Sequence, residues 1–125
     1  MNIRISNTSE KPIYQQIFEQ ISAQILKGEL EGGYVLPPIR QAAVELQVSI
    51  ITVKKAWEEL ERSGLIYTVT GKGCFIAELS PDRMIEKRNE MILKQMAVDL
   101  DYYKSFGLQL EEVIELLQSI YESET

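Results

Sequence analysis

Isoleucines recur at every fourth position near the start of the chain, and this spacing predicts a helix. They are Ile13, Ile17, Ile21 and Ile25. Because an α-helix completes a turn in 3.6 residues, such a repeat places its side chains on one face. Pro12 suits the first turn, where its missing N–H breaks no hydrogen bond, and Gly28 suits a helix end. We therefore expect a helix from Pro12 to Lys27.

Two shorter apolar repeats follow, separated by a connection of a few residues. The first predicts a helix from Ile39 to Leu46. Ser49 has the hydroxyl that commonly caps a helix start, and Gly64 marks the end of the helix that follows. The apolar stripe of this third helix consists of Val53, Ala56, Trp57 and Leu60, which we assign to the core. Two helices joined so closely are typical of a helix-turn-helix motif.

The next segment predicts a β-hairpin. Residues 66–70 and 74–77 are rich in β-branched and aromatic side chains, and Gly71, Lys72 and Gly73 form the turn between them. Three helices followed by a hairpin predict a winged helix. The expected fold class is mainly α (α+β): a winged helix-turn-helix with a small β-hairpin wing and a C-terminal tail of two helices.

The apolar pattern divides the chain into a winged-helix domain of residues 1–78 and a tail of residues 79–125. Ser80 and Pro81 suit the start of a long helix that ends near Tyr103, Gly107 breaks the pattern, and a last helix fits residues 110–121. Two short amphipathic helices cannot bury both stripes against a small domain alone, so we expect the tail to form a homodimer. Packing within one chain is the alternative. The predicted dimer contacts are Ile92, Met96, Leu100, Tyr103, Leu110, Val113, Ile114, Leu117 and Ile120.

Missing residue types narrow the chemistry. The chain has no histidine and a single cysteine, Cys74, so histidine-dependent catalytic triads and metal sites are excluded. It has no Gly-rich phosphate loop, and we expect no catalytic residue, metal or cofactor. No apolar run approaches the roughly 18 residues that span a bilayer, and the N-terminus is too polar for a signal peptide. A lone cysteine suits a reducing cytosol, which predicts a cytoplasmic protein without a membrane partner.

The net charge of −6 argues at first against nucleic acid as a partner. The acidity is unevenly distributed, however. Residues 1–78 have eight Lys and Arg against nine Asp and Glu, a net charge of −1, whereas residues 79–125 have five against ten, a net charge of −5. Because DNA binding depends on the local potential, the winged helix remains compatible with it.

The third predicted helix presents candidate DNA contacts. At 100° per residue, Ile51 and Lys55 point away from the apolar stripe, with Thr52 and Lys54 beside them. The N-terminal end of a recognition helix usually meets base edges. Lys55 could read guanine or hold a phosphate, and Thr52 could do either or contact a thymine methyl group. We hypothesise the thymine contact for Ile51, which is otherwise an ordinary surface residue or is covered by a neighbouring element.

Arg40 and the hairpin tip are candidates for contacts with the DNA backbone. Arg40 lies in the first turn of the second predicted helix, where it would hold a phosphate or pair with a nearby glutamate. Gly71, Lys72 and Gly73 would let the hairpin tip approach the duplex backbone or minor groove. Such a turn is common in hairpins generally.

Five segments together match a known pattern. They are Pro12–Ile17, Gly28–Gly33 with Leu36–Gln41, Val48–Glu61, Gly64–Ile66 and Gly71–Ile76. On these segments the chain resembles the GntR family of bacterial transcription regulators, and its short tail with the break at Gly107 is similar to the YtrA-like branch. The resemblance implies a winged helix that binds a palindromic double-stranded DNA operator as a homodimer, usually as a repressor.

The resemblance also suggests residue roles. The family's DNA-contacting positions fall on Arg40, Ser49, Thr52, Lys55, Gly71 and Gly73. Pro38 replaces a usual serine and Ile50 replaces a common arginine, which leaves the operator sequence open. The YtrA-like branch suggests control of a transporter operon, while a small-molecule effector stays unknown.

Other function classes remain at this point. A winged-helix adaptor that binds proteins would show no salt-dependent affinity for DNA. An enzyme would need a pair of carboxylates in a cleft, and no such spacing stands out in the sequence. We therefore expect a DNA-binding regulator that is not an enzyme.

Overall fold

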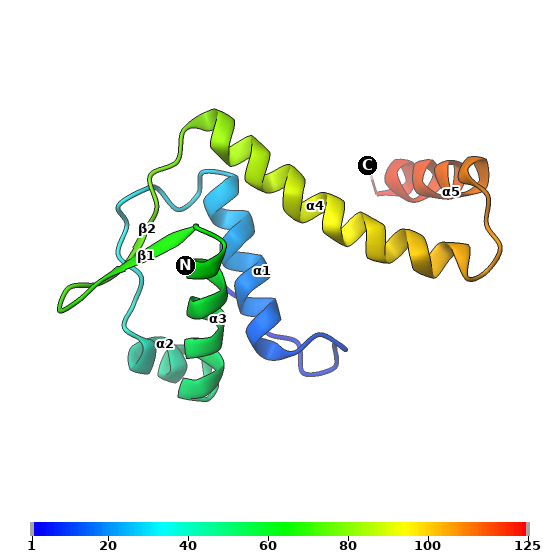
Figure 1. Cartoon of the computed structure of the whole chain (residues 1–125). Coiled ribbons are helices and arrows are strands. Elements are labelled where there is room, and N and C mark those ends of the chain that lie inside the picture. The colour runs from blue at the N-terminus through cyan, green and yellow to red at the C-terminus, as the bar shows by residue number, and fades with distance from the viewer. Residues whose placement is uncertain (1, 125) are drawn as a thin grey trace. The chain divides into compact units, whose positions relative to one another are not determined.

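The computed structural model describes residues 2–124, which form five helices and a two-stranded antiparallel sheet (Figure 1). The elements are α1 (Ile13–Leu26), α2 (Ile39–Leu46), α3 (Ile50–Arg62), β1 (Ile66–Val69), β2 (Gly73–Ile76), α4 (Pro81–Lys104) and α5 (Leu110–Ser123). By its internal contacts the chain forms two compact units, residues 1–86 and 87–125, and each is described by itself. The predicted winged-helix class is confirmed.

The core of the first unit is built around α3. This helix packs against α1, α2 and β1, and its predicted stripe of Val53, Ala56, Trp57 and Leu60 is buried as expected. Ile17 and Ile21 of α1 are fully buried as well. Each large aliphatic side chain that leaves water in this way contributes about 1.5–3 kcal/mol. The face of α3 opposite this stripe is thereby turned to solvent.

The turn between α2 and α3 fixes where α3 begins. Gln47 ends α2 in the left-handed conformation (φ 57°), and the Val48 N–H donates to the Ala43 carbonyl at 3.0 Å. Ser49 then caps α3, because its Oγ accepts from the Thr52 N–H at 3.0 Å. The predicted N-cap is confirmed, and it places the first turn of α3 directly after the turn of the motif.

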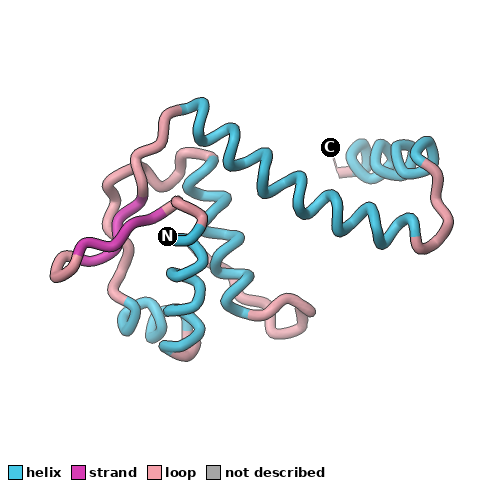
Figure 2. The backbone as a smooth tube through the Cα atoms, in the orientation of Figure 1, coloured by secondary structure: helices cyan, strands magenta, loops and turns pink. Residues whose placement is uncertain are grey.

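β1 and β2 form a hairpin (Figure 2). Its register sets Ile66 opposite Ile76 and Val69 opposite Gly73. β1 ends one residue earlier than predicted, and β2 is shifted by one residue toward the turn, so that it begins at Gly73 and ends at Ile76. The Lys72 N–H donates to the Val69 carbonyl at 2.9 Å and closes the turn. The wing is therefore a short two-stranded ribbon with residues 70–72 at its tip.

An extended arm before α1 is held by a row of glutamines that the sequence analysis did not anticipate. Gln20 accepts from the Arg4 N–H at 2.8 Å and donates to the Arg4 carbonyl at 2.6 Å. Gln16 makes the same pair of bonds with Ser6, at 2.8 and 2.9 Å. Gln24 donates to the Asn2 carbonyl at 2.6 Å. The three amides, four residues apart on one helix, thus bind alternate peptide groups of the arm.

The second unit contains most of α4 and all of α5. The two helices share few contacts within the described chain. Of the nine predicted dimer contacts only Val113 is buried; Leu100 and Tyr103 are half-buried and the other six are exposed. Gln109 and Glu112 form a capping box that fixes the start of α5. Among residues 2–124, no helix is long and apolar enough to cross a membrane.

We predict that Gln16→Ala lowers the free energy of unfolding by about 1–3 kcal/mol, because Gln16 is buried and its loss leaves the Ser6 N–H and carbonyl without partners. Urea denaturation measures the change. Gln41→Ala is the control, since the Gln41 amide bonds only to exposed Glu45, and it should change stability by less than about 0.5 kcal/mol. Equal effects of the two substitutions would show that the arm adds nothing to stability.

Candidate nucleic-acid interface

The first turn of α3 combines a cap with an exposed apolar surface. The Ser49 and Thr52 hydroxyls lie 2.7 Å apart and share a hydrogen bond, so Thr52 is held in place before any ligand arrives. Ile51 is 78% exposed. No neighbouring element of the described chain covers it, which removes one of the two alternatives to a DNA contact. Ile50, at 41% exposure, adds to this apolar surface.

The two lysines of α3 differ in where their ammonium groups lie. Both side chains are exposed. The Lys55 Nζ lies 4.1 Å from the ring centroid of Tyr14 on α1, so Lys55 extends toward α1 rather than straight away from the core. Sequence reasoning missed Tyr14, because only the packing of α1 against α3 brings it beside Lys55. Lys54 has no aromatic partner among the residues that the structure describes.

The cations of the first unit separate into two groups. Four of them form ion pairs with carboxylates: Lys11 with Glu19, Lys27 with Glu29, Arg62 with Glu59, and Arg83 with Glu86. By contrast, within residues 2–124 no ion pair involves any of the four predicted DNA-contacting cations, Arg40, Lys54, Lys55 and Lys72. The alternative of a salt bridge for Arg40 is therefore not seen. Within residues 2–124, cations of the first unit without a carboxylate partner therefore lie at the four predicted positions and, outside them, at Arg4.

The wing tip depends on glycine at two positions. Gly71 and Gly73 have φ values of +79° and +116°, a region that side chains with a Cβ rarely adopt. Nothing lies within 4 Å of where a Gly71 Cβ would stand, so the tip is open to a large partner. Lys72 between them is exposed.

Trp57, Cys74 and the acidic residues offer little evidence for base stacking, redox chemistry or metal binding. Trp57 is buried, which agrees with its assignment to the core. Cys74 is half-buried, and its Sγ lies 3.4 Å from the Thr68 hydroxyl. No group of three or more His, Cys, Asp or Glu residues able to hold a metal occurs within residues 2–124.

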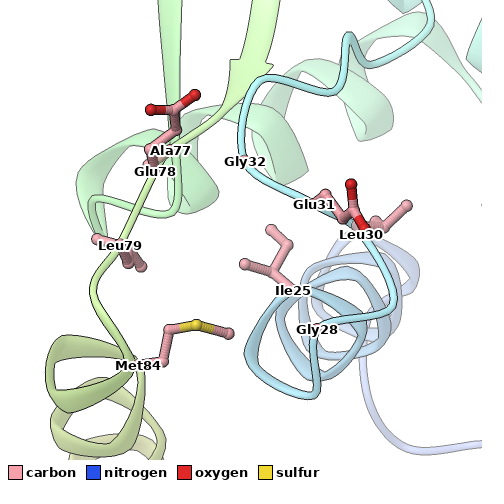
Figure 3. Close-up of a pocket in the computed structure, with 9 residues that line it drawn as sticks. All are labelled: Ile25, Gly28, Leu30, Glu31, Gly32, Ala77, Glu78, Leu79 and Met84. Atoms are coloured by element: carbon pink, nitrogen blue, oxygen red, sulfur yellow. The ribbon is translucent and has the colours of Figure 1, made fainter.

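The first unit also contains an open cavity of about 330 Å³ (Figure 3). It is lined by Ile25, Gly28, Leu30, Glu31, Gly32, Ala77, Glu78, Leu79 and Met84. The side chains of Ile25 and Met84 point into it. Gly32 also lines it, and a Cβ at this position would stand 2.6 Å from Cγ of Glu78. The cavity shares no residue with the predicted DNA contacts and forms no part of that surface.

Comparison with known proteins agrees with this arrangement. The family model described as "Bacterial regulatory proteins, gntR family" matches residues 13–76, which contain α1, the helix-turn-helix and the wing. The chain is also 37% identical to the HTH-type transcriptional repressor YtrA of Bacillus subtilis, over 94% of this chain and 91% of that one. The chain belongs to the GntR family. Members of this family are transcriptional regulators and not enzymes, as the sequence analysis expected.

Solved structures of GntR proteins support the family assignment. A GntR family transcriptional regulator from Listeria monocytogenes superposes with a TM-score of 0.73 at 29% identity, covering 92% of this chain and 98% of that one. The DNA-binding domain of AraR, solved in complex with an operator, superposes with a TM-score of 0.54 at 29% identity, covering 62% of this chain and 96% of that one. The winged helix of a relative thus binds operator DNA.

We expect Gly71→Ala to lower the free energy of unfolding by about 1 kcal/mol, because alanine is strained at a positive φ even where space is open. Thermal unfolding gives the measurement. Lys72→Ala serves as the matched control, since it removes a charge at the same tip and should leave stability unchanged. A neutral Gly71→Ala would mean that the turn adopts another conformation.

Proposed function

We propose that the chain is a sequence-specific transcription regulator, acting as a repressor, that binds a palindromic operator as a homodimer. The observation that carries the proposal is the set of cations without carboxylate partners at the start of α2, in α3 and at the wing tip. Such cations release condensed counterions when they meet phosphates, and this release supplies much of the affinity of proteins for DNA.

The N-terminal end of α3 enters the major groove in this proposal. Ile51 and Lys54 then face base edges, while Ser49 and Thr52 form a fixed first turn. An exposed isoleucine at such a place favours contact with a thymine methyl group. Arg40 at the start of α2 holds a phosphate.

The wing tip follows the duplex beside the recognition helix. Gly71, Lys72 and Gly73 approach the backbone or the minor groove, where the open surface around Gly71 admits the duplex.

The tail joins two copies of the chain. Six of the nine predicted dimer contacts on α4 and α5 are exposed, and the two helices share few contacts that would cover them. A second tail supplies the missing cover, and the dimer sets two recognition helices about 34 Å apart, one turn of DNA. We accordingly assign residues 1–78 to DNA binding and residues 79–125 to dimerisation.

The similarity to the HTH-type transcriptional repressor YtrA favours repression. The resemblance to the YtrA-like branch suggests a transporter operon as the target. A regulator of bacterial genes acts on DNA in the cytoplasm, where we place the protein. Its acidity is then concentrated in the dimerisation tail, which makes no contact with phosphates in this arrangement.

Selection from random duplexes, followed by footprinting and a salt titration, tests the proposal. We expect a palindromic site and an affinity that falls steeply with salt, because several phosphates are neutralised by each dimer. A winged-helix adaptor for proteins would select no sequence and would show no salt-dependent affinity, and that result would replace the proposal.

Ile51→Ser should change the base preference at one position of each half-site while stability stays within about 0.5 kcal/mol, because the side chain is exposed in the unbound protein. The selection experiment repeated with this variant gives the answer. Val44→Ser is the matched control: Val44 is equally exposed, at 77%, but lies outside the predicted contacts. An unaltered site with Ile51→Ser would remove Ile51 from base reading.

Leu117→Glu should convert the dimer to a monomer, because it places a charge in the predicted apolar stripe of α5. Sedimentation velocity measures the change, and operator affinity should fall with it. Ser119→Glu is the control, since Ser119 is exposed and lies on the side of α5 opposite the stripe. Dimers that survive Leu117→Glu, or dissociate equally with Ser119→Glu, would contradict the assigned face.

A further inference from the structure

We infer that Lys55 binds a DNA phosphate rather than a base, and that Tyr14 of α1 is the residue that positions it. The inference rests on the proposed function, because it assigns roles within the same DNA-binding surface. It also gives the first turn of α1, outside the helix-turn-helix and the wing, a role in positioning that surface.

The contact between Lys55 and Tyr14 joins two helices. Tyr14 is the second residue of α1 and is half-buried, so its ring is held by the packing of α1 against α3. The Lys55 Nζ lies 4.1 Å from the ring centroid, within the range where a cation is attracted to the negative face of an aromatic ring. The ammonium group is therefore held at the α1 edge of the exposed face of α3.

The carboxylates that could have neutralised Lys55 do not do so. Glu58 and Glu59 follow it by three and four residues, the spacing at which ion pairs form along a helix. Glu59 instead binds Arg62. No ion pair of Lys55 occurs in the described part of the chain, so its charge is available to a partner, and the ring covers only one side of its three N–H donors.

An ammonium group in this position suits a phosphate. It is a compact and strongly hydrated point charge, and its contact with Tyr14 holds it toward α1, whereas a lysine that reads guanine must reach O6 and N7 in the major groove. Lys54, 100° around the helix and without an aromatic partner, remains free to extend toward the bases together with Ile51.

The contact with the ring also restricts the Lys55 side chain before DNA binds, and this restriction favours DNA binding. A long side chain loses rotamer freedom when it is fixed on DNA, and the loss is smaller if the unbound protein already restricts it. Tyr14 thus acts through Lys55 and need not contact DNA itself.

The test uses the full chain and the duplex site found by selection. We expect Lys55→Ala to weaken binding by the same factor for the best site and for its single-base variants, and to lower the slope of log affinity against log salt by about 1. Tyr14→Leu should weaken binding about threefold, in keeping with one exposed cation–π contact. Tyr14→Phe retains the ring and should bind like the wild type. In the Lys55→Ala background, Tyr14→Leu should add no further loss.

A measurement on the unbound protein checks the contact independently of DNA affinity. The ring current of Tyr14 should move the Lys55 Hε resonances upfield in the NMR spectrum of the wild type. Resonances at ordinary lysine positions would overturn the positioning role, even if Tyr14→Leu proved poorly folded and could not be compared.

Other outcomes separate this inference from the proposed function. A change of preference at one base pair with Lys55→Ala would make Lys55 a base-reading residue and overturn the phosphate assignment, while the chain would remain a DNA-binding regulator. A loss with Tyr14→Phe, or an undiminished loss with Tyr14→Leu in the Lys55→Ala background, would overturn the positioning role. If the wild type binds no duplex at all, the proposed function fails first and this inference fails with it.

Discussion

The burial of one face of α3 is the constraint on which the rest of the first unit depends. Val53 and Leu60 on that face are fully buried, and α1, α2 and β1 all pack against the helix. Because a helix cannot rotate without withdrawing these side chains from the core, the orientation of its exposed face is fixed. The cap at Ser49 then determines which residue begins that face. Specific recognition needs this rigidity, since a side chain that reads a base must be held in one direction.

Charge distribution reconciles an acidic chain with a polyanionic partner. The net charge of −6 describes the whole molecule, whereas a ligand meets only the local potential. Ion pairs neutralise most of the other cations of the first unit, such as Lys11 and Lys27. Arg40 and Lys54 form no ion pair within residues 2–124. Surplus carboxylates elsewhere also repel DNA that approaches in the wrong orientation, so the same distribution favours correctly oriented encounters.

Local periodicity predicted the elements well because it depends on near neighbours. The repeat of isoleucines, the stripe around Trp57 and the cap at Ser49 all involve residues within a turn or two, and the structure agrees with each. The contact between Lys55 and Tyr14 could not be predicted in this way, because it depends on how two distant helices pack. Local periodicity does not determine the dimer contacts either. A single chain shows which side of an apolar stripe is exposed but not what covers that side in a dimer.

The glutamine row that holds the arm has a consequence for how this stretch can vary. Within residues 2–124, the amides of Gln16, Gln20 and Gln24 bond only to peptide groups of the arm at Asn2, Arg4 and Ser6, with one further bond from Gln16 to the Lys11 carbonyl. Recognition through the backbone is indifferent to most side chains, so the arm can change its sequence freely between related proteins. Proline is the exception at positions 4 and 6, because it lacks the N–H that the amide oxygens require. We therefore expect the length of the arm, and the absence of proline at these two positions, to matter more to the fold than its other side chains.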